Sequence, residues 1–171
     1  ESLAADLRLG STSPPDGEHE ALAAQRGMRT ARVSSMPSVV FAGEANTLAA
    51  VRAVTAGYPL RGRLKTSERL LGEVRITDAV PGPGDAWAAP RLLARLGTDA
   101  GTELEVGATT LRVTRVLDFR PDEGWSFVDL APTLLINEAD LAATQLVQPG
   151  SRVSYRLLFA GERGAVDAFK D

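Results

Sequence analysis

The sequence predicts an α+β fold, and three observations support this prediction. A strand–helix–strand pattern lies near the N-terminal end, a similar pattern lies near the C-terminal end, and the stretch between them is rich in short β-prone runs. The chain has 171 residues, 44% hydrophobic and 24% charged, which suits one globular domain or two small lobes. Aromatic residues make up only 5%, so leucine, valine and alanine must build the core.

The N-terminal pattern begins with Ala4–Leu9, where apolar and charged residues alternate as in a strand. Pro14 suits the start of a helix, whose acidic first turns complement the helix dipole and which runs to about Arg26. Thr30–Ala42 predicts a second strand, and Pro37 within it belongs at a sheet edge or a bulge because proline cannot donate a hydrogen bond.

A third β-prone run, Leu48–Thr55, leads into a loop that contains Gly57, Tyr58 and Pro59. Gly57 permits a left-handed turn, and Tyr58 is pushed toward extended geometry by the proline that follows it. Pairing is expected to stop at Pro59, which fixes its own φ and lacks an N–H. This loop is the predicted exit from the first strand–helix–strand unit.

The middle of the chain, residues 61–124, predicts a small inserted β-rich lobe. Pro81–Gly84 is a connector hostile to helices, and Pro90 can start a short helix, Arg91–Leu96, that Gly97 ends. A hairpin with its turn at Gly107–Ala108 is expected to follow. Its apolar pairs would come from Leu104 and Val106 on one strand and Leu111 and Val113 on the other.

The C-terminal pattern consists of an apolar strand, Thr133–Ile136, a short helix from Glu138 to about Thr144, and a last strand, Val153–Phe159. Asn137 is the expected N-cap of the helix. Two β-α-β units can share one split sheet, with both helices on one face. The sequence therefore predicts that the first and last strands, marked by Leu7 and Phe159, are neighbours in one sheet.

The composition excludes several kinds of chemistry. The chain has no cysteine and one histidine, His19, so neither disulfides nor a histidine-based zinc site is expected. A net charge of −3 without a basic stripe argues against nucleic-acid binding. The Pro81–Gly84 connector lacks the lysine and following helix of a phosphate-binding loop, so no nucleotide or other cofactor is predicted.

No catalytic constellation emerges from the remaining residues. The serines of the second strand lack a nucleophile elbow, and Asp122 and Glu123 lie in a Pro-Asp-Glu-Gly sequence typical of a solvated turn. The serines are Ser34, Ser35 and Ser38. We therefore predict no enzymatic activity in this chain.

Aromatic and apolar residues near turns are the better candidates for function, as a hinge or as a contact surface. They are Tyr58, Pro59, Leu60, Trp125 and Phe127. Exposed, they would form a surface for a partner or a lipid-like ligand. The alternative is that they pack where the two lobes join.

Several short motifs, in this order and spacing, resemble the extracytoplasmic domain of FtsX/MacB-like ABC-transporter permeases, and most of all the YbbP-type branch. The resemblance covers nearly the whole chain. The motifs are Val54–Gly62 (Val-Thr-Ala-Gly-Tyr-Pro-Leu-Arg-Gly), Ser38–Gly43, Trp87–Leu93, Asp129–Asn137 and Gln148–Val153.

The resemblance implies a two-lobed domain: a split β-α-β core lobe from residues 1–60 and 125–162, the inserted lobe at 61–124, and a tail at 163–171 leading toward a membrane helix. It also implies a non-catalytic domain on the outer side of the bacterial cytoplasmic membrane. ATP would be hydrolysed by a separate ATP-binding subunit, a second permease unit would be a partner, and the cargo would be hydrophobic or lipid-like.

Two alternatives from the residues alone stay open. One is a stand-alone α+β module that binds a protein partner or a ligand through an apolar patch. The other is a hydrolase, which would need a serine or carboxylate in a pocket beside a base.

Overall fold

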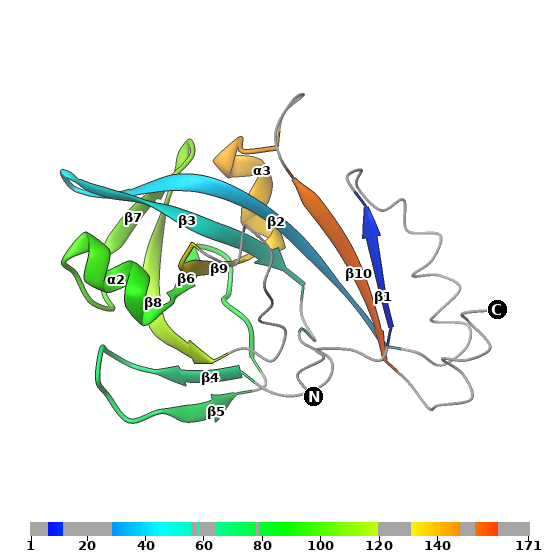
Figure 1. The fold of residues 1–171 in the computed structure, drawn as a ribbon, viewed down its shortest axis with the longest axis horizontal. Helices are drawn as coiled ribbons and strands as arrows, with labels where there is room; N and C mark the ends of the chain where they lie inside the picture. The colour runs from blue at the N-terminus through cyan, green and yellow to red at the C-terminus, as the bar shows by residue number, and fades with distance from the viewer. Residues whose placement is uncertain are drawn as a thin grey trace.

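The computed structural model describes residues 7–11, 29–55, 58, 64–77, 79–119, 131–147 and 153–160. These residues form a mainly β structure with few and short helices (Figure 1). The strands are β1 (Leu7–Ser11), β2 (Arg29–Ala42), β3 (Ala45–Val54), β4 (Leu64–Ser67), β5 (Arg75–Thr77), β6 (Asp85–Ala88), β7 (Glu103–Val106), β8 (Thr109–Phe119), β9 (Thr133–Asn137) and β10 (Ser154–Ala160). The helices are α2 (Pro90–Leu96), η2 (Glu138–Asp140) and α3 (Leu141–Thr144).

Six of these strands close into a ring. Strand β2 pairs with β3, β3 with β9, β9 with β6, β6 with β8, β8 with β7, and β7 returns to β2. The β3–β9 and β6–β8 pairs are parallel and the other four are antiparallel. Closure satisfies the backbone groups that an open sheet would leave at its edges, so this part of the chain is a small mixed barrel.

The two longest strands, β2 and β8, extend out of the barrel. The N-terminal half of β2 pairs with β10, which in turn pairs with β1. The C-terminal end of β8 pairs with β4, which carries the edge strand β5. All ten strands therefore belong to one sheet.

Pro37 lies in the one stretch of β2 that the strands on its outer side leave unpaired. Strand β10 pairs with β2 as far as Ser35, and β7 pairs with it from Val40. In the β2–β3 pair, Pro37 lies opposite Ala50. The Ala50 N–H does not point toward β2, because it donates to the Pro132 carbonyl on the β9 side. The missing N–H of Pro37 would thus face the gap, which confirms the prediction of a local edge.

Alternation along the strands separates two apolar clusters. The barrel interior takes one face of each strand, with Val51, Ile136 and Val113 among its fully buried residues, and Leu92 and Leu93 of α2 pack into it. A second cluster lies on the opposite face of these strands. It contains Ala31, Val33, Val54, Tyr58, Leu64, Trp87, Leu117 and Leu135.

Most of the local predictions are confirmed. Helix α2 begins at Pro90, and Gly97 ends it in the left-handed conformation with φ 66°. The β7–β8 hairpin places Leu104 opposite Leu111, although Val106 faces Thr109. Leu7 and Phe159 are partners in the β1–β10 pair, as the two-ended sheet requires.

The two-lobed division is not confirmed. Strands from the predicted core lobe (β2, β3, β9) form one half of the barrel and strands from the predicted inserted lobe (β6, β8, β7) form the other half, and both halves share one interior. The lobe prediction came from chain order, whereas the barrel is closed by pairings between segments distant in the sequence. The helix expected before β2, together with His19, lies outside the described residues, so the split β-α-β arrangement stays a prediction.

Candidate functional site

The only predicted site residue within the described part of the chain is Tyr58. Tyr58 is 1% exposed and belongs to the second apolar cluster, together with Leu64 and Trp87. It therefore adds nothing to an outer contact surface in this structure. Pro59, Leu60, Trp125 and Phe127 lie outside the described residues, and their role as a hinge or contact surface stays a prediction.

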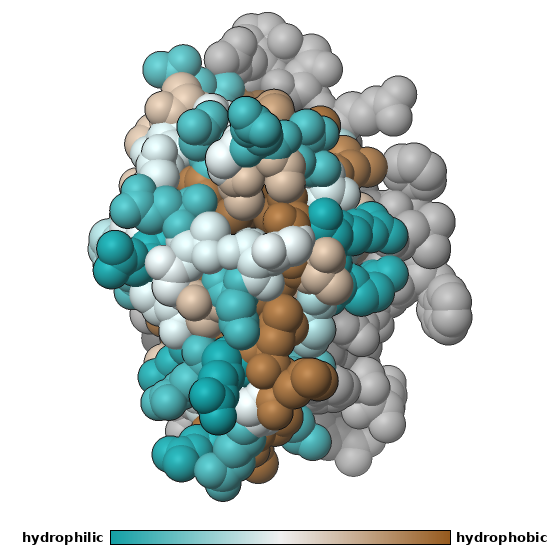
Figure 2. Space-filling view, turned by 90° about the vertical axis from the view of Figure 1, so that its left-hand side faces the viewer, coloured by the Kyte–Doolittle hydropathy of each residue, from teal (hydrophilic) through white to brown (hydrophobic). Residues whose placement is uncertain are grey.

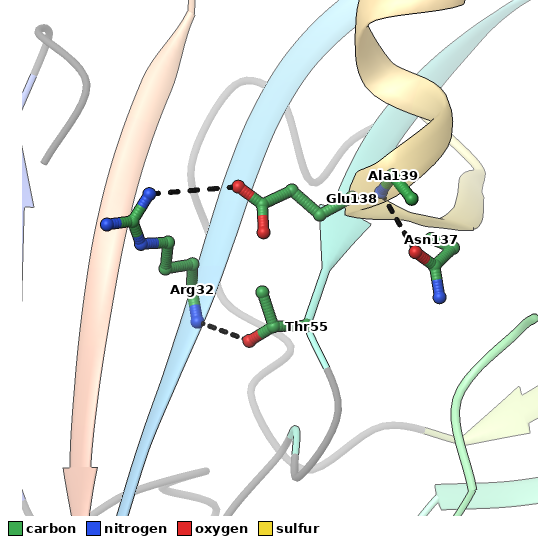
Figure 3. A network of polar contacts seen from close by, with 5 residues as sticks. All are labelled: Arg32, Thr55, Asn137, Glu138 and Ala139. Carbon is green, nitrogen blue, oxygen red and sulfur yellow. Dashed lines mark hydrogen bonds and ion pairs between the residues drawn. The ribbon is translucent and has the colours of Figure 1, made fainter. Parts of the chain in front are cut away.

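Thr55 fixes the backbone where the chain leaves β3 toward Tyr58 (Figure 3). The Thr55 Oγ1 accepts a hydrogen bond of 2.8 Å from the Arg32 N–H, and the Thr55 N–H donates to the Arg32 carbonyl at 3.2 Å. The Thr55 carbonyl then accepts from the Tyr58 N–H at 3.3 Å. One residue thus holds the exit of β3 against β2 and begins the turn that buries Tyr58.

Arg32 also joins β2 to the short helix after β9. Its guanidinium Nη1 lies 3.9 Å from the Glu138 Oε1, with 28% and 33% of the two side chains exposed (Figure 3). Asn137 accepts the Ala139 N–H at 2.9 Å, which confirms its predicted capping role and fixes the start of η2. The network ties β2, the end of β3 and η2 to one another.

Two side chains at the start and end of η2 form hydrogen bonds with the Pro81–Gly84 connector. The Asn137 Nδ2 donates to the Pro81 carbonyl at 2.9 Å, and the Asp140 Oδ2 accepts the Gly84 N–H at 2.8 Å. The connector is therefore anchored at both ends, and with it the start of β6.

Arg52 is a buried charge that the sequence pattern did not reveal. It is 1% exposed on β3, and its Nη1 donates a 3.0 Å hydrogen bond to the Ser35 Oγ, its register partner on β2. No local motif distinguishes it from the exposed arginines, because its burial depends on which strands pair. A permanently charged guanidinium cannot serve Ser35 as a base.

The third serine considered as a nucleophile, Ser38, lies farther along β2. The Ser38 hydroxyl donates to the Val39 carbonyl at 3.3 Å, which is a local backbone contact. Among the described residues, no group of three or more histidine, cysteine, aspartate or glutamate side chains is placed to hold a metal ion. The contacts at this junction join β2, the end of β3, η2 and the connector.

Comparison with known proteins places this fold among the extracellular domains of ABC transporters. The chain superimposes on the extracellular domain of the noncanonic ABC-type transporter YknZ from Gram-positive bacteria with a TM-score of 0.60 and 12% identity, over 92% of this chain and 79% of that one. A domain of a permease protein from Porphyromonas gingivalis gives a TM-score of 0.47 at 10% identity, which is too distant to bear on the fold.

The sequence itself matches one particular permease. It is 34% identical over 170 residues to the uncharacterized ABC transporter permease YbbP of Escherichia coli K12, covering 99% of this chain. The resemblance to the permease family is thereby confirmed: this chain is a relative of the extracytoplasmic part of ABC-transporter permeases.

The chain spans about a fifth of YbbP, since the match covers 20% of that protein. No family model matches the chain. Within the described residues, none of the helices combines the length and the apolar character needed to cross a membrane.

Proposed function

We propose that this chain is the non-catalytic extracytoplasmic domain of an ABC-transporter permease, and that it couples ATP-driven motion to the handling or export of a hydrophobic or lipid-like substrate. The observation that carries the proposal is the 34% identity to a permease over 99% of the chain. ATP would be hydrolysed by a separate subunit on the other side of the membrane, and a second permease unit would complete the transporter.

The pairing of the first and last described strands supports this placement. Leu7 faces Phe159, and Ala160 faces Arg29 at the start of β2. Membrane segments attached before Glu1 and after Asp171 would thus act on strands that lie side by side. Their relative movement would pass into β2, which carries it from β10 into the barrel.

The junction around Thr55 supplies the route for such a movement. Arg32 contacts both Thr55 and Glu138, and η2 in turn holds the Pro81–Gly84 connector. In the proposed mechanism, Tyr58, Pro59 and Leu60 form the hinge at the exit of β3, with Tyr58 as its buried end. Trp125 and Phe127, as part of the same hinge or contact surface, belong to the same proposal.

Deletion of the domain from the complete transporter tests the proposal. Residues 29–160 would be replaced by a short flexible linker, and the transporter would be purified with its ATP-binding subunit in lipid nanodiscs. We expect basal ATP hydrolysis to persist and its stimulation by lipid-like compounds to be lost. Unchanged stimulation without the domain would refute a coupling role and favour a stand-alone interaction module.

A further inference from the structure

The exposed large hydrophobic residues of the described chain are concentrated on two hairpins. Six of the seven belong to β2–β3 or β4–β5, and only Val147 lies elsewhere. On β4–β5 they are Leu71 (104% exposed), Val74 (50%) and Ile76 (59%); on β2–β3 they are Val39, Phe41 and Leu48. The β4–β5 group is set apart by its charged neighbours.

Basic side chains surround the apolar residues of the β4–β5 hairpin. Lys65, Arg69 and Arg75 are all exposed. The hairpin also carries two exposed acidic residues, Glu68 and Glu73, and the second of them lies 3.3 Å from Arg75 in an ion pair. Basic residues therefore outnumber acidic ones beside an apolar tip.

Helix α2 adds two arginines to this end of the molecule. Arg91 and Arg95 are exposed, whereas the leucines of α2 are buried on its opposite face. Residues four apart lie on one side of a helix, with Cβ atoms about 5–6 Å apart, so the two guanidinium groups can reach one anion. Among the described residues, neither arginine forms an ion pair. Like charges at this spacing, with Arg91 in the first turn where the helix dipole disfavours a cation, destabilise the helix, and the fold gives no reason for them.

The hairpin and α2 are joined by a hydrogen bond. The Leu70 N–H donates to the Asp99 Oδ1, in the loop after α2, at 2.7 Å, and the same oxygen accepts a second backbone N–H. Arg69, next to Leu70, is therefore held near the C-terminal end of α2. Residues 64–77 and 90–99 together carry five basic and three acidic residues, a net charge of +2, whereas the whole chain has −3.

The hairpin turn combines exposure with backbone strain. Leu71 has φ 60°, a left-handed conformation that is unfavourable for leucine, and its side chain contributes no burial to the fold. This turn and α2 lie at the end of the molecule opposite to β1 and the C-terminal end of β10 (Figure 1). Figure 2 views this end and shows hydrophobic residues running down its middle, with hydrophilic residues on both sides. An apolar centre with a hydrophilic rim indicates a contact outside the fold.

We propose that this end of the molecule binds an anionic phospholipid. The two arginines of α2 and Arg69 receive the phosphate headgroup, because the planar guanidinium fork matches phosphate oxygens. The three apolar residues of the hairpin contact the acyl chains, which favours an amphiphile over a free phosphate. The place of this lipid in transport rests on the proposed function, whereas the binding itself does not.

The proposal can be tested on the 171-residue chain with vesicles of two compositions. One is phosphatidylcholine alone, which has no net charge; the other is equal parts phosphatidylcholine and phosphatidylglycerol, which is anionic. Cosedimentation gives an apparent Kd for each, and melting curves verify that every variant is folded. The test variants are Arg91→Gln and Arg95→Gln, made singly, and Leu71→Asn, because asparagine tolerates a positive φ.

Two matched controls remove the same kinds of side chain elsewhere. Arg112→Gln removes an exposed arginine of β8, which pairs with Glu103 at 3.7 Å. Phe41→Ser removes an exposed apolar side chain of β2–β3, where the neighbouring charged residues, Glu44 and Glu105, are acidic.

We expect the anionic vesicles to bind at least about tenfold more tightly than the neutral ones, and less tightly as salt is raised. Each arginine substitution in α2 should weaken this binding by about fivefold and Leu71→Asn by about tenfold, while each control changes it by less than about twofold. Equal binding to both kinds of vesicle, no saturable binding, or equal losses in the controls would overturn the proposal.

Two further measurements separate the other occupants. Inorganic polyphosphate that binds as tightly as the anionic vesicles, with a Kd that Arg95→Gln raises and Leu71→Asn leaves unchanged, would replace the lipid with a soluble phosphate compound. A concentration-dependent dimer in analytical ultracentrifugation that Leu71→Asn dissociates would replace it with a second copy of this chain. None of these readouts needs the complete transporter, so the lipid proposal can fail while the permease assignment stands.

Discussion

Substitution of Gly107 by alanine should destabilise the fold well beyond the usual effect of a glycine in a turn. Gly107 has φ 57°, and a Cβ there would overlap the Thr144 carbonyl oxygen and lie 3.0 Å from the Thr144 carbonyl carbon. Alanine at a left-handed position costs about 1–2 kcal/mol. Relief of the overlap would also break the 2.8 Å hydrogen bond from the Ala108 N–H to the Thr144 carbonyl, worth about 1 kcal/mol.

The expected loss is therefore about 2–3 kcal/mol, which lowers the melting temperature by about 4–12 °C for a chain of this size. Gly43→Ala is the matched control: Gly43 has φ 61°, and a Cβ there would meet no atom within 4 Å. Calorimetry should give a drop of about 2–8 °C for the control, smaller than the drop of Gly107→Ala measured beside it because the lost hydrogen bond is absent. Equal drops in the two variants would show that the β7–β8 turn is not packed against α3.

Three other substitutions have distinct expected results. Pro59→Gly should lower the free energy of unfolding of the isolated chain by about 1 kcal/mol, because it raises the entropy of the unfolded state. In the full transporter the same change should reduce the stimulation of ATP hydrolysis. A large loss of thermal stability with unchanged stimulation would show that this loop is only a structural turn. Leu71→Gly should raise the free energy of unfolding in urea titrations by up to about 1 kcal/mol, since it relieves the left-handed strain without loss of burial; destabilisation would mean that Leu71 supports the hairpin. Glu138→Gln should change the free energy of unfolding by less than about 1 kcal/mol, and by less still at high salt, because the ion pair with Arg32 is about a third exposed. A larger loss that does not depend on salt would contradict this expectation.

Local sequence signals predicted the elements well where the chemistry is local. Pro90 and Gly97 bound α2, Asn137 caps η2, and the turn at Gly107 closes the β7–β8 hairpin. Each of these residues acts through its own φ or through a hydrogen bond to a near neighbour, so its effect can be read from a few consecutive residues.

The barrel and the contacts around Thr55 could not be predicted in this way. The β2–β7 and β9–β6 pairings join segments distant in the sequence, and it is these pairings that merge the predicted lobes into one sheet. Arg32 and Glu138 are brought together by strand pairing and not by any local motif. Likewise, Arg52 reads as one more scattered arginine until strand pairing buries it beside Ser35.

Of the predicted hinge, only Tyr58 could be compared with the structure. Tyr58 is buried, which agrees with the alternative that these residues pack inside the fold and do not form an exposed surface. The exposed hydrophobic residues instead lie on the β2–β3 and β4–β5 hairpins. Periodicity did not single them out, since Phe41 and Ile76 alternate with their neighbours as core residues do.

The topology of the full-length protein tests the central claim most directly. This chain contains no cysteine, so Glu44→Cys, at the exposed β2–β3 turn, can carry a unique thiol in a full-length version from which any other cysteines are removed. Spheroplasts would be treated with a membrane-impermeant maleimide, with a cytoplasmic cysteine-containing protein as the internal control. An extracytoplasmic domain predicts that Cys at this position is labelled before lysis while the control protein is not. Labelling of both proteins only after lysis would contradict the account.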